Sequence, residues 1–145
     1  MAQTKLIIFG DPKRPHAAEA VEQFVDFVSD KADILVNCLD VTCSLETLKE
    51  ADFAVVFGGD GTILSAARQL CETAVPVIGV NVGKLGFLAE FSPDELKRLF
   101  DRIIKDDSLI EKRMILDCRT ERKGEQIFSS TAVNDVVITS GTPFS

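Results

Sequence analysis

The chain has 145 residues, which is the length of one domain, or of one domain and the beginning of another. Its 46% hydrophobic and 27% charged residues are typical of a globular protein and unlike a disordered chain. The 16 Lys and Arg residues against 23 Asp and Glu residues give a net charge of −7, which opposes sequence-independent binding to nucleic acid or to an anionic membrane. A small phosphorylated ligand is still compatible with this charge, because a helix N-terminus binds phosphate without a basic surface.

The cysteines and the N-terminus bear on the cellular location. Cys38, Cys43, Cys71 and Cys118 show neither a CxxC spacing nor a nearby histidine cluster, so we expect reduced thiols, with neither a zinc site nor a disulfide framework. No run approaches the roughly 18 apolar residues that cross a membrane. The N-terminus leads into a short apolar strand rather than a signal peptide, which predicts a cytoplasmic protein.

Four apolar runs rich in β-branched residues alternate with helical patterns. The runs are Leu6–Phe9, Ile34–Leu39, Phe53–Phe57 and Val75–Val82. This alternation predicts an α/β fold over residues 1–110, with a Rossmann-like, mostly parallel sheet and crossover helices.

The helical patterns lie between and after these strands. Apolar residues at helical spacing from Ala17 to Val28 predict one helix, Leu45–Glu50 a single turn, and Thr62–Cys71 a further helix. Residues 92–95 read Ser-Pro-Asp-Glu, a capping box with proline at the first helical position, and predict a helix through Ile104.

The pattern changes beyond residue 107. Met114–Thr120 and Gln126–Ser130 predict two strands joined through Lys123-Gly124, and Val136–Thr139 predicts a third. So few strands form a stable sheet only when they pack against further structure. We therefore expect residues 111–145 to be the start of an incomplete, β-rich second domain.

The most informative segment is Gly58-Gly59-Asp60-Gly61-Thr62, which lies between a predicted strand and a predicted helix. In a parallel sheet this turn lies at the carboxyl end of a strand, where ligands of open α/β folds bind. The glycines let the backbone approach a ligand, and Thr62 can cap a helix whose N-terminus favours an anion. The Asp60 carboxylate would repel a phosphate, so its presence in this turn indicates a task of its own. It can accept the proton of an attacking hydroxyl, or it can hold Mg²⁺. Either task indicates phosphoryl transfer.

Other interpretations of this segment are possible. Gly-Gly-Asp-Gly can be simply a tight turn in which the aspartate hydrogen-bonds locally, although the flanking strand and helix favour a functional role. The sequence contains no G-x-x-x-x-G-K-[ST] and no G-x-G-x-x-G after a strand, so neither a P-loop NTPase nor a standard dinucleotide dehydrogenase is supported.

A second glycine-rich segment, residues 79–88, also lies at the end of a predicted strand. Two such loops at neighbouring strand ends can enclose one crevice, in which Lys84 supplies positive charge and Phe87 a face for an aromatic ring. The alternative is that Phe87 and Leu88 belong to the core and Lys84 is solvated.

Polar residues elsewhere are weaker candidates. Asn134-Asp135 precede the strand predicted at 136–139, and their side chains can hydrogen-bond ribose hydroxyls or ring nitrogens. Lys13 and Arg14 follow the first strand, where they could contact phosphates, although exposed basic residues beside prolines are usually solvated.

Together these segments resemble the NAD kinase family. The matching residues, in chain order, are Gly58-Gly59-Asp60-Gly61-Thr62, Gly79-Val80-Asn81-Val82-Gly83-Lys84-Leu85-Gly86-Phe87-Leu88 and Asn134-Asp135-Val136-Val137-Ile138. The first element is shared with diacylglycerol- and sphingosine-type lipid kinases and, in similar form, with phosphofructokinases. The second element is the one that singles out NAD kinases.

The resemblance implies transfer of a phosphoryl group from ATP, or from polyphosphate in some members, to the 2′-hydroxyl of the adenosine ribose of NAD, with Mg²⁺. It implies that Asp60 activates this hydroxyl, that the neighbouring glycines and Thr62 approach the phosphates, and that Phe87 lies against the dinucleotide. Asn134 would contact adenosine, and Asp135 stands where the family usually has the longer glutamate.

The resemblance also implies that the chain is the N-terminal portion of such a kinase and that residues 111–145 begin its NAD-binding domain. Family members are about twice as long, so we expect this chain alone to be inactive. Two alternatives are a lipid or sugar kinase that shares the GGDGT element, and a non-catalytic nucleotide-binding or assembly fragment. An unpaired strand edge near the C-terminus favours a homo-oligomer under any of these readings.

Overall fold

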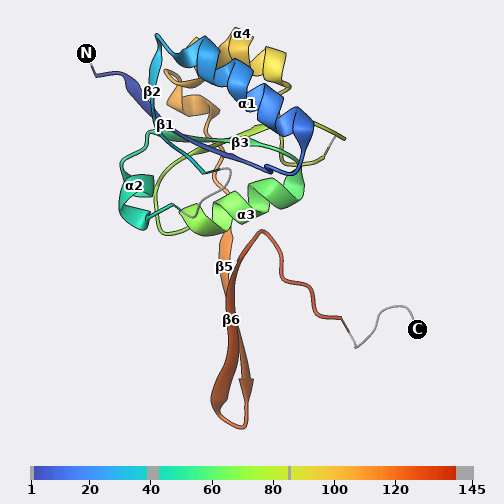
Figure 1. The fold of residues 1–145 in the computed structure, drawn as a ribbon. Coiled ribbons are helices and arrows are strands. Elements are labelled where there is room, and N and C mark those ends of the chain that lie inside the picture. The colour runs from blue at the N-terminus through green and yellow to red at the C-terminus, as the bar shows by residue number, and fades with distance from the viewer. Residues whose placement is uncertain (1, 39–42, 85, 140–145) are drawn as a thin grey trace. The chain divides into compact units, whose positions relative to one another are not determined.

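The computed structural model describes residues 2–38, 43–84 and 86–139 (Figure 1). The chain divides into two compact units, Met1–Glu111 and Lys112–Ser145. Among the described residues, no helix has the length and apolar character needed to span a bilayer.

The first unit contains a four-stranded parallel sheet. Its strands are β1 (Thr4–Gly10), β2 (Ala32–Asn37), β3 (Phe53–Phe57) and β4 (Val77–Val80), in the order β2-β1-β3-β4. All three neighbouring pairs are parallel, which confirms the predicted sheet. The expected strand end at residue 39 lies outside the described residues.

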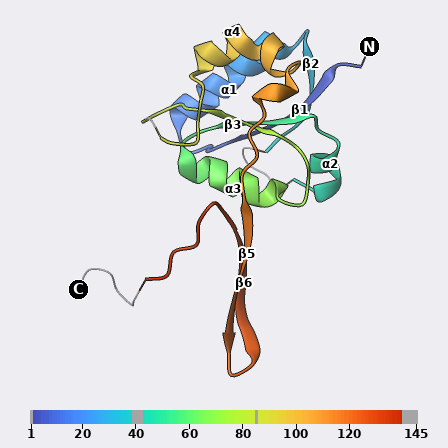
Figure 2. The same cartoon turned by 180° about the vertical axis from the view of Figure 1, so that it is seen from behind.

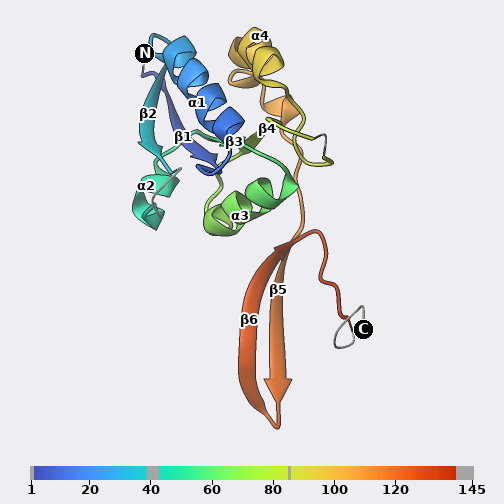
Figure 3. The ribbon, with the colours of Figure 1, turned by 45° about the vertical axis from the view of Figure 1, so that its right-hand side comes forward.

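Four helices cover the two faces of this sheet. They are α1 (Pro15–Val28), α2 (Leu45–Lys49), α3 (Asp60–Leu70) and α4 (Pro93–Ile103), followed by a short 3-10 turn at Asp107–Leu109. Helices α1 and α4 lie on one face, and α2 and α3 lie on the other (Figure 3). The fold is therefore the predicted α/β arrangement.

The core has two layers because successive strand residues point to opposite faces of the sheet. On the face covered by α1 and α4, Val55 and Phe57 pack with Phe24 and Phe100, and the Phe24 ring centroid lies 5.5 Å from that of Phe57 and 5.7 Å from that of Phe100. On the other face, Val56 packs with residues of α2 and α3. Every residue of β3 is buried, as expected for an interior strand of a parallel sheet.

The start of α4 confirms the predicted capping box. The Ser92 side chain accepts a hydrogen bond from the Glu95 N–H at 3.2 Å, and the Glu95 carboxylate accepts one from the Ser92 N–H at 2.9 Å. Pro93 occupies the first turn, where its missing N–H costs nothing.

The second unit contains an antiparallel hairpin of β5 (Ile115–Arg122) and β6 (Glu125–Val133) (Figure 2). Lys123 and Gly124 have φ of 52° and 81°, the left-handed conformation of a two-residue hairpin turn. The prediction of a third strand at Val136–Thr139 is wrong, because these residues form no strand in the structure. An apolar β-branched run forms a strand only when a partner strand supplies hydrogen bonds, and the local pattern does not reveal that partner.

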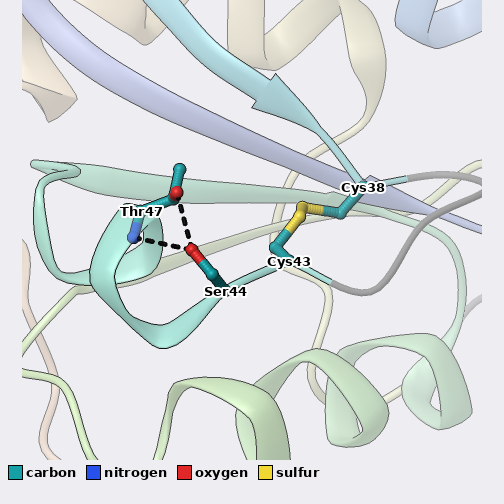
Figure 4. Close-up of a disulfide and its surroundings, with 4 residues drawn as sticks. All are labelled: Cys38, Cys43, Ser44 and Thr47. Carbon is teal, nitrogen blue, oxygen red and sulfur yellow. Dashed lines mark hydrogen bonds between the residues drawn. A yellow bond between two sulfur atoms is a disulfide. The ribbon is translucent and has the colours of Figure 1, made fainter.

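The prediction that all cysteines are reduced is also wrong. Cys38 and Cys43 form a disulfide with a Cα–Cα distance of 6.2 Å, whereas Cys71 and Cys118 are free thiols (Figure 4). Cys38 directly follows β2, and Cys43 directly precedes Ser44, the N-cap of α2, so the connection from strand to helix brings the two sulfur atoms together. A separation of five residues is not a recognised disulfide pattern, and therefore the sequence alone did not indicate the bond.

Candidate active site

The carboxyl ends of β1 and β3 form the centre of the candidate site. From β1 the chain crosses to β2 on one side, and from β3 it crosses to β4 on the other, so the strand order reverses between β1 and β3. Open α/β sheets bind ligands at such a point. The Gly-Gly-Asp-Gly-Thr segment lies directly after β3 at this point.

Gly58 continues the strand for one residue. Its N–H donates to the carbonyl oxygen of Val80 at 2.9 Å, and a Cβ at this position would lie 2.6 Å from the Thr62 Cβ and Oγ1. The absence of a side chain therefore lets the first turn of α3 fold back over the strand end.

The expected capping role of Thr62 is wrong. Helix α3 begins at Asp60, and its N-cap is Gly59, which has an extended backbone and provides no side-chain hydrogen bond. Thr62 instead lies in the first helical turn with its side chain against Gly58. A helix N-terminus without a side-chain cap can donate its first N–H groups to an anion.

The Asp60 carboxylate connects the first glycine-rich segment to the second. Its Oδ2 accepts a hydrogen bond from the Phe87 N–H at 3.0 Å, and its Oδ1 accepts one from the Leu88 N–H at 2.9 Å. These two bonds, the Phe87 bond first, lower the pKa of Asp60 below its ordinary value of 3.8, although partial burial acts in the opposite direction. Asp60 is consequently ionised at neutral pH.

The second glycine-rich segment leaves the end of β4 and returns to it. The Gly83 N–H donates to the Asn81 side-chain oxygen at 2.9 Å, which forms a tight turn. Phe91 then pairs with Val80, and the Asn81 N–H donates to the Phe91 carbonyl oxygen at 2.8 Å. Both ends of the loop between Val80 and Phe91 are therefore held beside β4 by hydrogen bonds.

Two of the predicted binding residues in this segment face solvent. Lys84 is exposed, and Phe87 is 95% exposed. Leu88, in contrast, is half-buried and packs against the core formed with α2 and α3. The alternative is therefore wrong for Phe87, whereas the packing of Leu88 and the exposure of Lys84 agree with it.

The loop after β1 approaches the same edge of the sheet. Arg14 Nε lies 3.5 Å from Asp11 Oδ2, and Arg14 Nη1 lies 3.7 Å from the position that a Cβ on Gly83 would occupy. Lys13 is exposed, and its N–H donates to Asp11 Oδ1 at 3.0 Å. Arg14 is thus the basic residue of this loop that reaches the second glycine-rich segment.

Asn134 and Asp135 belong to the second unit and follow β6. The Asn134 N–H donates to the Met114 carbonyl oxygen at 3.0 Å, and Asn134 adopts a left-handed conformation with φ of 69°. Both residues are exposed. Their contribution to a site with Asp60 remains a prediction.

A metal site made by the protein alone is not present in the described part of the chain, where no three His, Cys, Asp or Glu residues cluster. Magnesium in phosphoryl-transfer sites is commonly held by one or two carboxylates together with the substrate phosphates. Asp60 fits this limited role, because each of its oxygens accepts one backbone hydrogen bond and retains a further lone pair.

Sequence reasoning placed Gly86 in the resemblance but did not identify it as a site residue. A Cβ on Gly86 would lie 2.5 Å from Asp60 Oδ1. The signal available in the sequence was a second glycine three residues after Gly83. The sequence could not show that the Asp60 side chain would approach it.

Comparison with known proteins identifies the family. A sequence model described as the ATP-NAD kinase N-terminal domain matches residues 29–108, which is more than half of the chain. This chain belongs to the NAD kinase family. The same segment of the chain includes both glycine-rich elements and all of β3 and β4.

Curated relatives in the family cover more of the chain. The NAD kinase of Rhodopirellula baltica is 31% identical over 140 residues, which is 97% of this chain and 45% of that protein. The NAD kinase of Heliobacterium modesticaldum is 37% identical over 144 residues, 93% of this chain and 50% of that protein. The NAD kinase of Geobacter sulfurreducens is 47% identical over 91 residues, 63% of this chain and 32% of that protein.

A solved structure shares the fold. The crystal structure of yeast NADH kinase complexed with NADH matches 91% of this chain and 47% of that chain, with a TM-score of 0.69 and 22% sequence identity. The chain thus spans half or less of the length of each of these relatives.

Proposed function

We propose that the chain is the N-terminal portion of an NAD kinase, which transfers a phosphoryl group from ATP or polyphosphate to the 2′-hydroxyl of the adenosine ribose of NAD. The observation that carries this proposal is the placement of Asp60. An ionised carboxylate lies at the uncapped N-terminus of α3, at the strand-order reversal, and in contact with the segment that presents Phe87. Membership of the NAD kinase family supports the choice of substrate.

In the proposed reaction the 2′-hydroxyl oxygen forms a bond to the terminal phosphorus of the donor, and the bond from that phosphorus to the bridging oxygen breaks. The hydroxyl proton passes to Asp60, and ADP leaves when ATP is the donor. The two backbone hydrogen bonds keep Asp60 ionised and fix its direction, which favours positioning over high basicity. A divalent cation bound with the nucleotide would neutralise phosphate charge.

The remaining binding residues follow from the same proposal. The first N–H groups of α3, at Gly61 and Thr62, approach phosphate, with Gly58 and Gly59 allowing a close turn. Phe87 and Lys84 form the wall contributed by the second segment. Asn134 and Asp135 contact adenosine, and the parent protein acts as a homo-oligomer in the cytoplasm.

The experiment that tests the proposal measures NADP formation from ATP, Mg²⁺ and NAD. We expect no product from residues 1–145 alone, because the family's second domain supplies part of the NAD pocket. Residues 1–145 joined to the remaining half of the Heliobacterium modesticaldum NAD kinase should form NADP. The Asp60→Asn variant of this fusion should lower kcat by roughly 100-fold or more, since general-base catalysis contributes about that factor.

The matched control is Glu90→Gln, which neutralises an exposed carboxylate in the loop between Val80 and Phe91. This variant should retain the activity of the unaltered fusion. A fusion that binds ATP or NAD but is equally active with Asp60→Asn would contradict the role of Asp60. A folded fusion that never forms NADP would contradict the proposed function and favour a non-catalytic nucleotide-binding fragment.

A further inference from the structure

The Asp60 side chain joins the first glycine-rich segment to the backbone of residues 87 and 88 in the second. Two consecutive N–H groups point to one carboxylate, and each carboxylate oxygen accepts one of them, at 3.0 Å from Phe87 and 2.9 Å from Leu88. Hydrogen bonds to an ionised acceptor are stronger than those between neutral groups. The contact therefore fixes the peptide planes on either side of Phe87.

Gly86 allows this contact. A Cβ at this position would lie 2.5 Å from Asp60 Oδ1, 2.8 Å from Cγ and 3.0 Å from Oδ2, so any side chain would displace the carboxylate. The approach of Asp60 thus requires that residue 86 have no side chain.

The residues that follow Phe87 are held differently, by packing. Leu88 is half-buried in the core, and Ala89 is buried. The Leu88 carbonyl oxygen and the Ala89 Cα lie 3.2 Å and 3.1 Å from the position that a Cβ on Gly79 would occupy. Phe87 immediately precedes these packed residues. It is itself 95% exposed, so its side chain has no such packing.

An exposed phenyl ring needs a backbone that holds it outward. Burial of a phenylalanine side chain is favourable, so a mobile loop would turn the ring toward apolar surface. Among the described residues, only Asp60 accepts hydrogen bonds from the N–H groups on either side of Phe87. The carboxylate thus opposes collapse of the ring.

We propose that Asp60 and Gly86 form a clamp that positions Phe87, so that the ring projects from the carboxyl edge of the sheet as a binding wall for a flat ring of the ligand. This inference deepens the proposed function and rests on it for the identity of the ligand. Gly86 is a positioning residue that acts through Asp60. Asp60 acts on Phe87 in addition to its proposed role at the hydroxyl.

The test measures backbone amide hydrogen exchange by NMR in the 145-residue chain. Gly86→Ala and Asp60→Ala should each raise the exchange rates of the Phe87 and Leu88 amides by roughly tenfold or more, the factor expected when a hydrogen bond to a charged group is lost. The amides of α4 should exchange as in the unaltered chain, which shows that the fold persists. Gly61→Ala is the matched control, since its added methyl meets no atom within 4 Å apart from its chain neighbours and the backbone of its own helix, and it should leave both amides protected.

A double-mutant cycle separates the clamp from a general structural effect of Gly86. If Gly86 acts only by admitting the carboxylate, Gly86→Ala should have no further effect on exchange in the Asp60→Ala background. Persistence of its full effect in that background would overturn the proposal. Unchanged exchange in both single variants, with the fold intact, would also overturn it.

A tryptophan at position 87 reports on the ring itself, because the chain has no tryptophan or tyrosine. In Phe87→Trp, fluorescence anisotropy should fall when Gly86→Ala is added and stay unchanged when Gly61→Ala is added. Neither readout needs a ligand. A clamp that is intact while the fusion never forms NADP would contradict the proposed function alone, whereas NADP formation with freely exchanging amides would contradict the clamp alone.

Discussion

At the residue scale, the ionised Asp60 carboxylate has two opposing effects on the proposed reaction. The N–H groups of Phe87 and Leu88 stabilise its charged form, which makes the carboxylate a well-placed but weak base. The same charge would repel a bound phosphate, and the N-terminus of α3 offsets this repulsion with its partial positive charge. In the proposed phosphoryl transfer, Asp60 therefore contributes positioning more than basicity.

The lowered pKa of Asp60 predicts a pH dependence of stability. Because the folded chain holds Asp60 with a pKa below the ordinary value of 3.8, the unfolded chain binds more protons in the acid range. The contribution of Asp60 to the free energy of unfolding is therefore complete when the pH lies above the ordinary pKa of 3.8. It is lost as the pH falls through the lower pKa of the folded state. Asp60→Asn should flatten this acid limb, measured as the free energy of unfolding by urea between about pH 2 and pH 6. An acid limb of equal slope in the variant would contradict the prediction.

Helix α4 is the element whose boundary depends most clearly on local sequence. The reciprocal hydrogen bonds between Ser92 and Glu95 satisfy two backbone N–H groups, while Leu96 and Phe100 bury the apolar side of the helix. The hairpin of β5 and β6 also has a local cause, since Lys123-Gly124 adopts the turn that its residues predict. These elements form where short-range chemistry is sufficient.

Removing the cap of α4 should lower stability. Ser92→Ala should reduce the free energy of unfolding by about 1 kcal/mol, the usual cost of losing a side-chain N-cap. Urea unfolding provides the measurement. Ser65→Ala, an exposed position within α3, is the control and should cause no loss, because alanine is the better helix former. Equal loss in both variants would show that the capping box is not responsible.

The connection between β2 and α2 gives a second prediction at this scale. The disulfide of Cys38 and Cys43 closes a short loop, for which the chain-entropy relation gives a stabilisation of about 2 kcal/mol. Cys43→Ser should lower the unfolding free energy by about that amount without reductant and by little in dithiothreitol. Cys71→Ser, which replaces a free thiol, should respond equally in both conditions. Insensitivity of the unaltered chain to dithiothreitol would contradict the prediction.

At the scale of the whole molecule, the two units differ in what stabilises them. The buried hydrophobic residues lie between Leu6 and Ile103, all within the first unit. No described residue of the second unit is buried, and an isolated two-stranded hairpin is marginally stable at best. The first unit therefore has the core of an independent domain.

A chain that ends at Glu111 should consequently fold. We expect it to unfold cooperatively in urea and to keep the amide spectrum of α1, α3 and α4. A peptide of residues 112–145 should show little hairpin structure by NMR, because it buries no apolar core. Loss of cooperative unfolding in the shorter chain would contradict the assignment of the core to the first unit.

The sequence determined the parts that depend on near neighbours along the chain. Apolar periodicity located the four parallel strands and the helices, the Ser-Pro-Asp-Glu segment located α4, and the family resemblance rested on residues that can be read in order. The spacing of apolar residues and the capping of a helix depend only on a few consecutive residues. One sequence is therefore sufficient to predict them.

Only the tertiary structure decided which residues meet across the chain. It moved the start of α3 to Asp60, paired Cys38 with Cys43, left Val136–Thr139 without a strand, and turned the Asp60 carboxylate toward residues 87 and 88. Each of these outcomes depends on a partner that lies elsewhere in the chain, or on the lack of one. Strand order and the exit direction of each loop set those partners, and neither is written in a local pattern.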